Sequence, residues 1–143
     1  MSTATDARKT MRGSDGYVWV DNVPVAMLQS CEFKVEANYE EITACGDPST
    51  YQQLNGTSGS GSIKVKKISS DLNFSISEEF RTGVIGDHSI TTKIASPTGG
   101  TERIRLNSVT FDEVTLAAFE TGSIMEDEYP VKFASWQYLD RIK

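Results

Sequence analysis

The sequence is poor in the residues that bind transition metals or carry nucleophilic catalysis. Its 143 residues include one histidine, His88, and two cysteines, Cys31 and Cys45. A structural zinc site needs four Cys or His ligands, and the G-x-S-x-G turn that presents a nucleophilic serine is absent. We therefore expect no catalytic residues, no metal site and no cofactor, and we expect His88 to be a surface residue.

Positive charge and long apolar runs are also scarce. The chain holds 14 Lys and Arg against 20 Asp and Glu, a net charge of −6, whereas a general nucleic-acid binder needs a basic face. No apolar run approaches the roughly 20 residues that span a bilayer, so we expect no stable membrane association. The opening residues lack the apolar core of a secretory signal. We accordingly expect folding in a reducing cytosol, with both cysteines as free thiols.

Two segments alternate between apolar and polar residues, which is the pattern of β-strands with one face on a core. Residues 31–40 place Cys31, Phe33, Val35, Ala37 and Tyr39 on the predicted core face, and residues 58–67 alternate in the same way. Antiparallel pairing of the two strands would bring opposite charges across from one another. The polar positions are Glu32, Lys34, Glu36, Asn38 and Glu40 in the first segment, and Ser60, Ser62, Lys64 and Lys66 in the second.

The remaining chain reads as further strands and one helix. Residues 1–15 have no periodic pattern and are interpreted as a flexible arm, and 16–143 as a single domain. Leu72, Ile76 and Phe80 recur at helical spacing between Ser69 or Ser70 as N-cap and Gly83 as C-cap. Strands are predicted at 16–20, 25–28, 89–95, 102–111, 115–124 and 129–138, with a bulge near residues 107–108 and Pro130 at a strand start or edge. Residues 42–57 are predicted to be a long loop. The fold class is therefore mainly β with one α-helix.

Two clusters suggest chemistry but have simpler explanations. The glycine-rich stretch 56–62 with Lys64 resembles a phosphate loop, yet it leads into a strand rather than a helix. We interpret Gly59 and Gly61 as sites of close backbone approach. The acidic runs at 112–113 and 126–128 lack the spacing of a calcium loop and are interpreted as solvated surface.

The alternating charges allow two interpretations. They are either the solvated side of an ordinary sheet, or the wall of a water-filled channel formed when several copies join their sheets edge to edge. Joining would also pair the edges of long strands. If such a channel shared the net charge of the chain, it would be acidic and would repel DNA.

Three stretches resemble the tail tube proteins of contractile phage-like particles, of the XkdM-like type found in Gram-positive prophages. The first is Gly16-x-Val18-Trp19-x-Asp21 with Val25-Ala26, and the second is Gly56-x-Ser58-Gly59-x-Gly61 with Ile63-Lys64 and Lys67. The third comprises Val109-Thr110-Phe111-Asp112, Leu116-Ala117, Phe119-Glu120, Gly122, Pro130, Phe133 and Tyr138-Leu139-Asp140. The chain departs from the family in its longer polar N-terminus and in Cys31 and Cys45.

The resemblance implies a β-sandwich or barrel-like domain with a flanking helix. It implies hexameric rings that stack into the rigid inner tube of a contractile phage tail or phage-tail-like bacteriocin, assembled in the host cytoplasm. The implied partners are further copies of the chain, the sheath, the baseplate and tape-measure proteins, with DNA passing through the lumen without specific binding. The polar strand positions named above would line the lumen. Contacts between stacked rings would come from Asp47, Pro48, Tyr51, Gln52, Leu54 and Asn55.

Two other classes stay open at this stage. One is a secreted hexameric tube protein of a contractile secretion system, which would share the architecture. The other is a carbohydrate-binding β-sandwich, which would display aromatic residues on one exposed platform, whereas Trp19 and Trp136 fall in strand patterns typical of a core or an interface.

Overall fold

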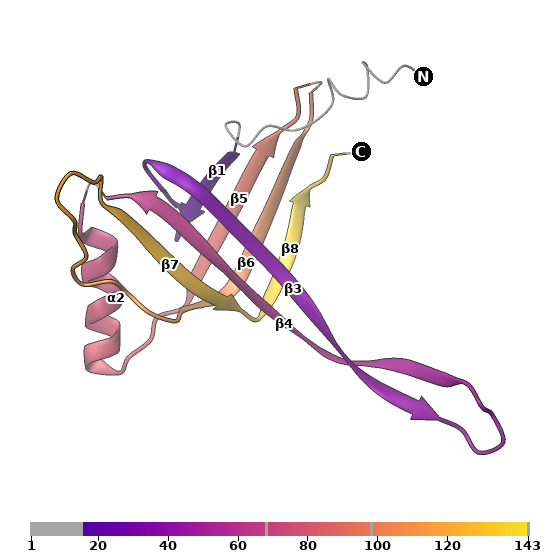
Figure 1. Cartoon of the computed structure of the whole chain (residues 1–143). Helices are drawn as coiled ribbons and strands as arrows, with labels where there is room; N and C mark the ends of the chain where they lie inside the picture. The colour runs from indigo at the N-terminus through magenta and orange to yellow at the C-terminus, as the bar shows by residue number, and fades with distance from the viewer. Residues whose placement is uncertain (1–15, 68, 98, 143) are drawn as a thin grey trace.

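The computed structural model describes residues 16–67, 69–97 and 99–142, and within them the chain forms eight strands and one helix (Figure 1). The predicted N-terminal arm, residues 1–15, lies outside the described residues. The elements are β1 (Gly16–Val20), β2 (Val23–Pro24), β3 (Leu28–Thr43), β4 (Thr50–Lys66), α2 (Asp71–Thr82), β5 (His88–Ala95), β6 (Thr101–Phe111), β7 (Glu126–Phe133) and β8 (Ser135–Asp140).

The strands form two antiparallel sheets that share β6. The first sheet has the order β2-β1-β5-β6-β8, and the second has the order β6-β7-β4-β3. The second sheet lies in front of the first in Figure 1, and α2 lies at one end of the pair. The prediction of a mainly β, sandwich-like domain with one flanking helix is confirmed.

A bulge in β6 allows this strand to belong to both sheets. His88 pairs with Val109 but Ile90 pairs with Leu106, so β6 contains one extra residue between these two pairs. Ser108 takes a positive φ of 53° there. The predicted bulge near residues 107–108 is thus confirmed, and beyond it β6 pairs with β7 instead of β8.

The core fills the space between the sheets and beneath the helix. It consists of inward-facing residues from five strands and one residue of α2: Val18, Val20, Ile63, Val65, Ile76, Ile90, Leu106, Val109, Phe111, Tyr129, Val131 and Phe133. Ile63 and Val65 confirm the predicted core face of β4, where they alternate with polar residues on the other side.

The helix is close to its prediction. It starts after Ser70 and ends at Gly83, whose φ of 76° is the left-handed conformation that a C-cap glycine supplies. Ile76 is buried and Leu72 packs against the core, but Phe80 is 42% exposed. The core-facing side of the helix therefore runs through Asn73 and Ile76 rather than along the full predicted stripe.

The first hairpin is tighter than predicted. Val20 pairs with Val23 and Trp19 with Pro24, so the return strand is β2 and not residues 25–28. Asp21 and Asn22 both have positive φ values, 52° and 66°. This is the two-residue turn geometry that matches the twist of β-strands and starts pairing at once.

The predicted loop at 42–57 is wrong, because most of it is strand. β3 continues to Thr43 and β4 begins at Thr50, leaving only residues 44–49 as a connection. Asn55 has no partner between the Asn38–Gly56 and Tyr39–Leu54 pairs, so it forms a bulge that reverses the side-chain parity of β4. Because of this reversal, the alternation of apolar and polar residues that would indicate a strand is interrupted in the sequence.

Two predictions for the C-terminal third are also wrong. Residues 115–124 form no strand, and their large apolar residues, Leu116, Phe119 and Ile124, are exposed at positions that share no single face of a strand. The predicted strand 129–138 is interrupted at Ala134, opposite the β6 bulge, and becomes β7 and β8.

Pro130 lies inside β7 rather than at its start or at a sheet edge. Its neighbour on one side is Ser62 of β4. Its carbonyl oxygen accepts a hydrogen bond from the Asp112 backbone N–H at 2.9 Å, just beyond the end of β6. Because the N and O of one residue point to the same side of a strand, the missing N–H faces the place where the β6 ladder stops.

Candidate functional site

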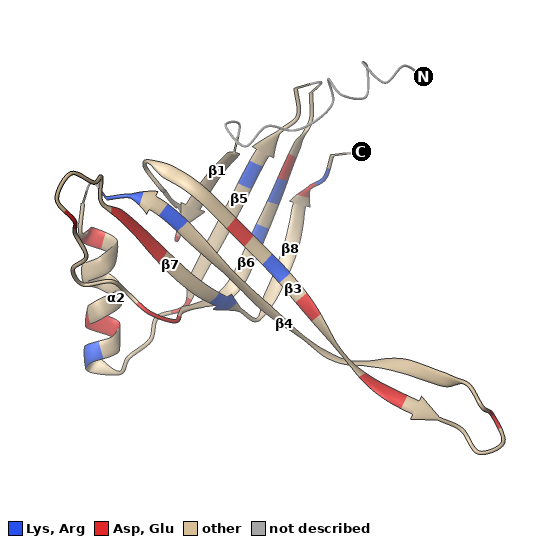
Figure 2. Ribbon diagram, in the orientation of Figure 1, with Lys and Arg blue, Asp and Glu red and all other residues tan. Residues whose placement is uncertain are grey.

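The side chains on the outer side of the second sheet are mostly polar, and Figure 2 shows charged residues of both signs along β3, β4 and β7. Cross-strand pairs such as Glu32–Ser62 and Ser62–Pro130 fix which side chains share this side. It carries eight of the nine predicted lumen residues, whereas Glu40 lies beyond the point where β3 and β4 leave the sheet. We call it the polar face, made of Glu32, Lys34, Glu36, Asn38, Ser60, Ser62, Lys64, Lys66, Glu126, Glu128, Pro130 and Lys132.

The charges on the polar face are balanced. Four glutamates oppose four lysines there, so the acidic lining expected from the net charge of the chain is not found on this face. The predicted pairing of charges between β3 and β4 is wrong, because Glu32, Lys34 and Glu36 each lie opposite a serine. Instead, Lys64 forms an ion pair at 3.2 Å with Glu126 of β7, a strand that the sequence did not place beside β4.

Gly59 and Gly61 of β4 allow close packing beneath the polar face, as predicted. A Cβ on Gly59 would collide with the ring of Phe133, and one on Gly61 would collide with the Glu32 carbonyl oxygen and the ring of Phe33. Any side chain here would push β4 away from its neighbours. The phosphate-loop alternative has no helix N-terminus to support it, since this stretch lies within β4.

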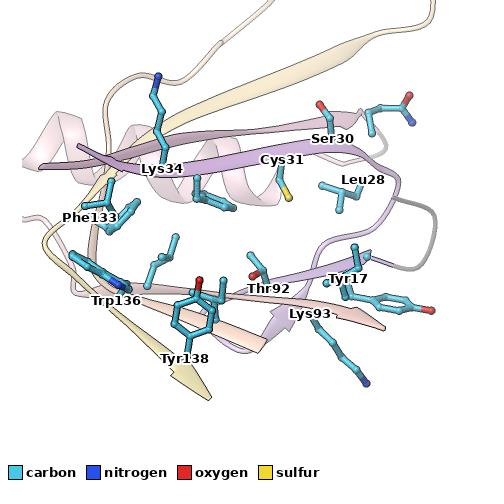
Figure 3. A pocket seen from close by; sticks show the side chains of 17 residues that line it. Tyr17, Leu28, Ser30, Cys31, Lys34, Thr92, Lys93, Phe133, Trp136 and Tyr138 are labelled. Atoms are coloured by element: carbon cyan, nitrogen blue, oxygen red, sulfur yellow. The ribbon is translucent and has the colours of Figure 1, made fainter. Parts of the chain in front are cut away.

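Behind the polar face, β3 and the first sheet enclose an open cleft of about 810 Å³ (Figure 3). Cys31 and Leu28 of β3 point into it, as do Trp136 and Tyr138 of β8, whereas Lys34 points away. The predicted core face of β3 is therefore mostly wrong. Only its Phe33 packs against the core. Cys31 and Val35 are exposed because they line the open cleft, and Ala37 and Tyr39 are exposed because they lie on β3 beyond the cleft.

The distal part of the β3–β4 hairpin projects away from both sheets (Figure 1). We call residues 39–54 the arm. Its ladder runs from the Tyr39–Leu54 pair to the Thr43–Thr50 pair. Tyr39, Ile42, Tyr51 and Leu54 are between 42% and 62% exposed, although they are the large apolar side chains of the arm.

The predicted ring-contact residues all belong to the arm or border it. Asp47 and Pro48 lie in its turn, Tyr51, Gln52 and Leu54 lie on β4, and Asn55 is the bulge. Asp47 accepts hydrogen bonds from the Ser49 backbone N–H and the Tyr51 hydroxyl, each at 2.9 Å. These bonds, the backbone one first, lower the pKa of the Asp47 carboxyl and keep the turn negatively charged.

His88 is not the surface residue that the sequence predicted. Its side chain is only 15% exposed, and its two ring nitrogens each lie 2.7 Å from a carboxylate oxygen, of Asp21 and of Glu79. Its ring also meets the ring of Phe111 edge-on at 5.3 Å. Burial lowers the pKa of His88, but the hydrogen bonds and charges of Glu79 and Asp21 outweigh it, so the net shift is upward.

A second buried polar cluster joins the helix to β7. Asp127, predicted to be solvated, is 4% exposed. Asn73 donates to Asp127 at 3.2 Å and to the Thr115 carbonyl oxygen at 3.1 Å, and it accepts a hydrogen bond from the Tyr129 hydroxyl. Burial, followed by the charge of Asp127, raises the pKa of Tyr129 to about 12. The period-two position of Asp127 beside Tyr129 was the available signal that this residue faces inward.

Both clusters are satisfied internally and neither resembles a reaction centre. Among the described residues, no group of three or more His, Cys, Asp or Glu side chains is arranged to hold a metal ion, and no helix is long and apolar enough to cross a membrane. Cys31 and Cys45 are free. The distinctive features are instead surfaces: the polar face, the arm, and the outer edges of β3 and β8, which have no partner strand in the described chain.

Comparisons with known proteins agree with this emphasis on surfaces. Residues 3–140 match the model of a family described as phage tail tube protein. The phage-like element PBSX protein XkdM of Bacillus subtilis is 26% identical over 144 residues, which cover 97% of each chain. The uncharacterized protein YqbM of the same organism is also 26% identical, covering 98% of this chain and 97% of its own.

Solved structures share the fold at much lower identity. A chain of the PVC sheath–tube complex, from an extracellular contractile injection system in the extended state, superposes with a TM-score of 0.77 at 13% identity, covering 99% of both chains. A chain of the anti-feeding prophage cap gives a TM-score of 0.72 at 8% identity, covering 92% of both.

Proposed function

The chain belongs to the family of phage tail tube proteins, and from this premise we propose that its copies form hexameric rings that stack into the inner tube of a contractile particle. It is a structural tail tube protein and a component of phage-like particles. The tube would be assembled in the host cytoplasm and driven through a target envelope by contraction of a surrounding sheath. No catalytic step is required of the chain.

The observation that carries this proposal is the long unpaired edge of β3. This strand has 16 residues, and among the described residues it pairs only with β4. A long edge strand exposes backbone N–H and C=O groups that readily pair with another chain. If neighbouring copies complete this edge, the second sheets join around a ring and their polar faces line a water-filled lumen.

The arm would connect one ring to the next. An isolated two-stranded ribbon is at best marginally stable in water, and the arm exposes four large apolar side chains. Packing against a copy in the neighbouring ring would bury them. The arm is thus the proposed axial contact, and the edges of the sheets are the proposed lateral contact.

A shortened arm tests both parts of this assembly. Replacing residues 40–53 by Asn-Gly joins the paired residues Tyr39 and Leu54 through a two-residue turn that suits a hairpin. We expect the wild-type protein to form hollow tubes in negative-stain micrographs as its concentration rises, and the variant to form single rings. Thermal unfolding of the variant should remain within a few degrees of wild type, because the arm contributes nothing to the buried core.

Two outcomes would contradict the proposal. Tubes of normal length from the variant would show that the arm is not the axial contact. A wild-type protein that stays monomeric at every concentration would exclude self-assembly through the edge of β3. The baseplate and tape-measure proteins, and DNA in the lumen, are further partners that the proposed tube would accommodate.

A further inference from the structure

The outer face of the first sheet lies on the opposite side of the molecule from the polar face, and its side chains are arranged in rows. Strand register places them in two rows across β1, β5, β6 and β8. We call this surface the basic face. Its rows are Tyr17, Lys93, Arg103 and Asp140, and then Trp19, Thr91, Arg105 and Gln137.

The basic face has a charge opposite to that of the chain. It carries three cations and one carboxylate, a net charge of +2, whereas the chain carries −6. Arg103 binds Asp140 at 2.6 Å. Within the part of the chain that the structure describes, Lys93 and Arg105 form no ion pair, in contrast to Arg103. Figure 2 shows the blue segments on β5 and β6.

The aromatic residues beside these cations also suit a binding surface. Tyr17 is 56% exposed and its ring centre lies 6.2 Å from that of Trp19. Arg, Trp and Tyr are the residues most enriched among those that dominate binding energies at protein interfaces. An arginine fork can hold a carboxylate through two parallel hydrogen bonds. The composition therefore fits an acidic protein surface.

We propose that the basic face binds the sheath, and that it recognises an acidic surface on the inner side of the sheath protein. This inference rests on the proposed tube. The two sheets pack against one another, so their outer faces point in opposite directions. If the polar face lines the lumen, the basic face points outward, toward the protein layer that surrounds the tube. In such a tube, neighbouring subunits would lie beside, above and below each subunit and would leave its basic face uncovered.

A nucleic acid is the other polyanion that such a face could attract. We favour a protein partner because the outer wall of a tube inside a sheath meets protein, and because the overall charge of −6 repels phosphates at longer range. Tyr17 and Trp19 are also neighbours on one strand and supply apolar contact area, which a phosphate backbone does not need.

Charge reversal tests the inference. The variant Lys93→Glu/Arg105→Glu alters the two unpaired cations and leaves the Arg103–Asp140 pair intact. The matched control, Lys66→Glu/Lys132→Glu, makes the same change in net charge on the polar face, on β4 and β7 and away from the edge of β3. Tubes of each protein would be checked by electron microscopy and then mixed with the sheath protein of the same particle. Sheath that sediments with the tubes would be measured from 50 to 500 mM salt.

We expect all three proteins to form tubes, and the basic-face variant to bind the sheath roughly tenfold or more weakly, as loss of well-placed interfacial charges does. Sheath binding by wild type should weaken with salt, because exposed charges are screened. The variant Arg105→Lys with Lys93 retained should bind the sheath measurably, since its charge is kept.

Each other outcome overturns the inference in an identifiable way. Sheath binding by the basic-face variant at the wild-type level would show that the sheath binds elsewhere. Failure of this variant alone to form tubes would make the basic face a contact between tube subunits. Salt-sensitive capture of duplex DNA by wild-type tubes, lost in the variant with sheath binding intact, would make it a nucleic-acid surface. If wild-type protein forms no tubes, the proposed function fails as well.

Discussion

The half-buried His88 should make the stability of the fold depend on pH near neutrality. Its two ring nitrogens both face carboxylate oxygens at 2.7 Å, from Asp21 and Glu79. A neutral imidazole has only one N–H to donate, whereas the imidazolium has two. The fold therefore favours the charged form. We consider the change His88→Gln, which keeps one amide donor but removes the charge and the second hydrogen bond.

The contacts in the structure set the expected size of the effect. A hydrogen bond to a charged group contributes about 1.5–3 kcal/mol, and the Asp21 side chain is 44% exposed, so its share is weakened by solvent. We expect His88→Gln to lower the free energy of unfolding by about 1–2 kcal/mol at pH 6. For a domain of this size that corresponds to a fall in melting temperature of roughly 3–6 °C.

The pH dependence follows from the raised pKa of His88 in the fold. Between the unfolded and folded pKa values, the folded chain binds more protons than the unfolded chain, so stability falls as the pH rises. The contribution of His88 is complete below the unfolded value of about 6.5 and disappears above the folded value. His88 is the only histidine, so no other imidazole can produce this slope.

Urea unfolding of wild type and His88→Gln between pH 5.5 and 9 would measure this pH dependence of stability. The difference in unfolding free energy between wild type and His88→Gln should be largest at pH 5.5–6 and shrink as the pH rises. Asp87→Asn, a change in the exposed carboxylate next in sequence, serves as the control and should leave the slope unchanged. Equal slopes for wild type and His88→Gln would refute the reasoning, because they would show that His88 is not preferentially charged in the fold.

Two further substitutions probe the interior. Gly61→Ala places a Cβ against the Glu32 carbonyl oxygen, so it should cost about 1–3 kcal/mol of stability in denaturant unfolding; an unchanged midpoint would show that β3 and β4 are not so closely packed. Asn73→Ala leaves Asp127 and the Tyr129 hydroxyl without their shared partner. It should cost about 1–3 kcal/mol in denaturant unfolding; a stability loss under 0.5 kcal/mol would argue against the cluster.

Features with a local signal could be predicted from the sequence. The strand alternation, the left-handed Gly83 and the β6 bulge all leave a mark within a few neighbouring residues. The apolar parity of β6 changes at the bulge, because an extra residue shifts every later side chain to the other face. The close approach at Gly59 and Gly61 was likewise marked by glycine within an alternating strand.

Features that depend on distant residues could not be predicted in this way. His88 contacts Asp21, which lies in a turn 67 residues earlier in the chain. The strands of the arm were not predicted because Asn55 and Gly56 are residues typical of a loop. The strands form nevertheless, because backbone hydrogen bonds between them do not depend on the type of side chain. The ion pair of Lys64 with Glu126 could be assigned only once β7 was identified as the neighbour of β4.

A helical reconstruction of tubes grown from the purified protein tests the central claim most directly. The account predicts a hollow cylinder in which β3, β4 and β7 of adjacent copies form one continuous wall, with Lys34 and Glu36 pointing into the channel. A cylinder whose channel is walled by the first sheet, with Arg105 pointing inward and the polar face outside, would contradict it.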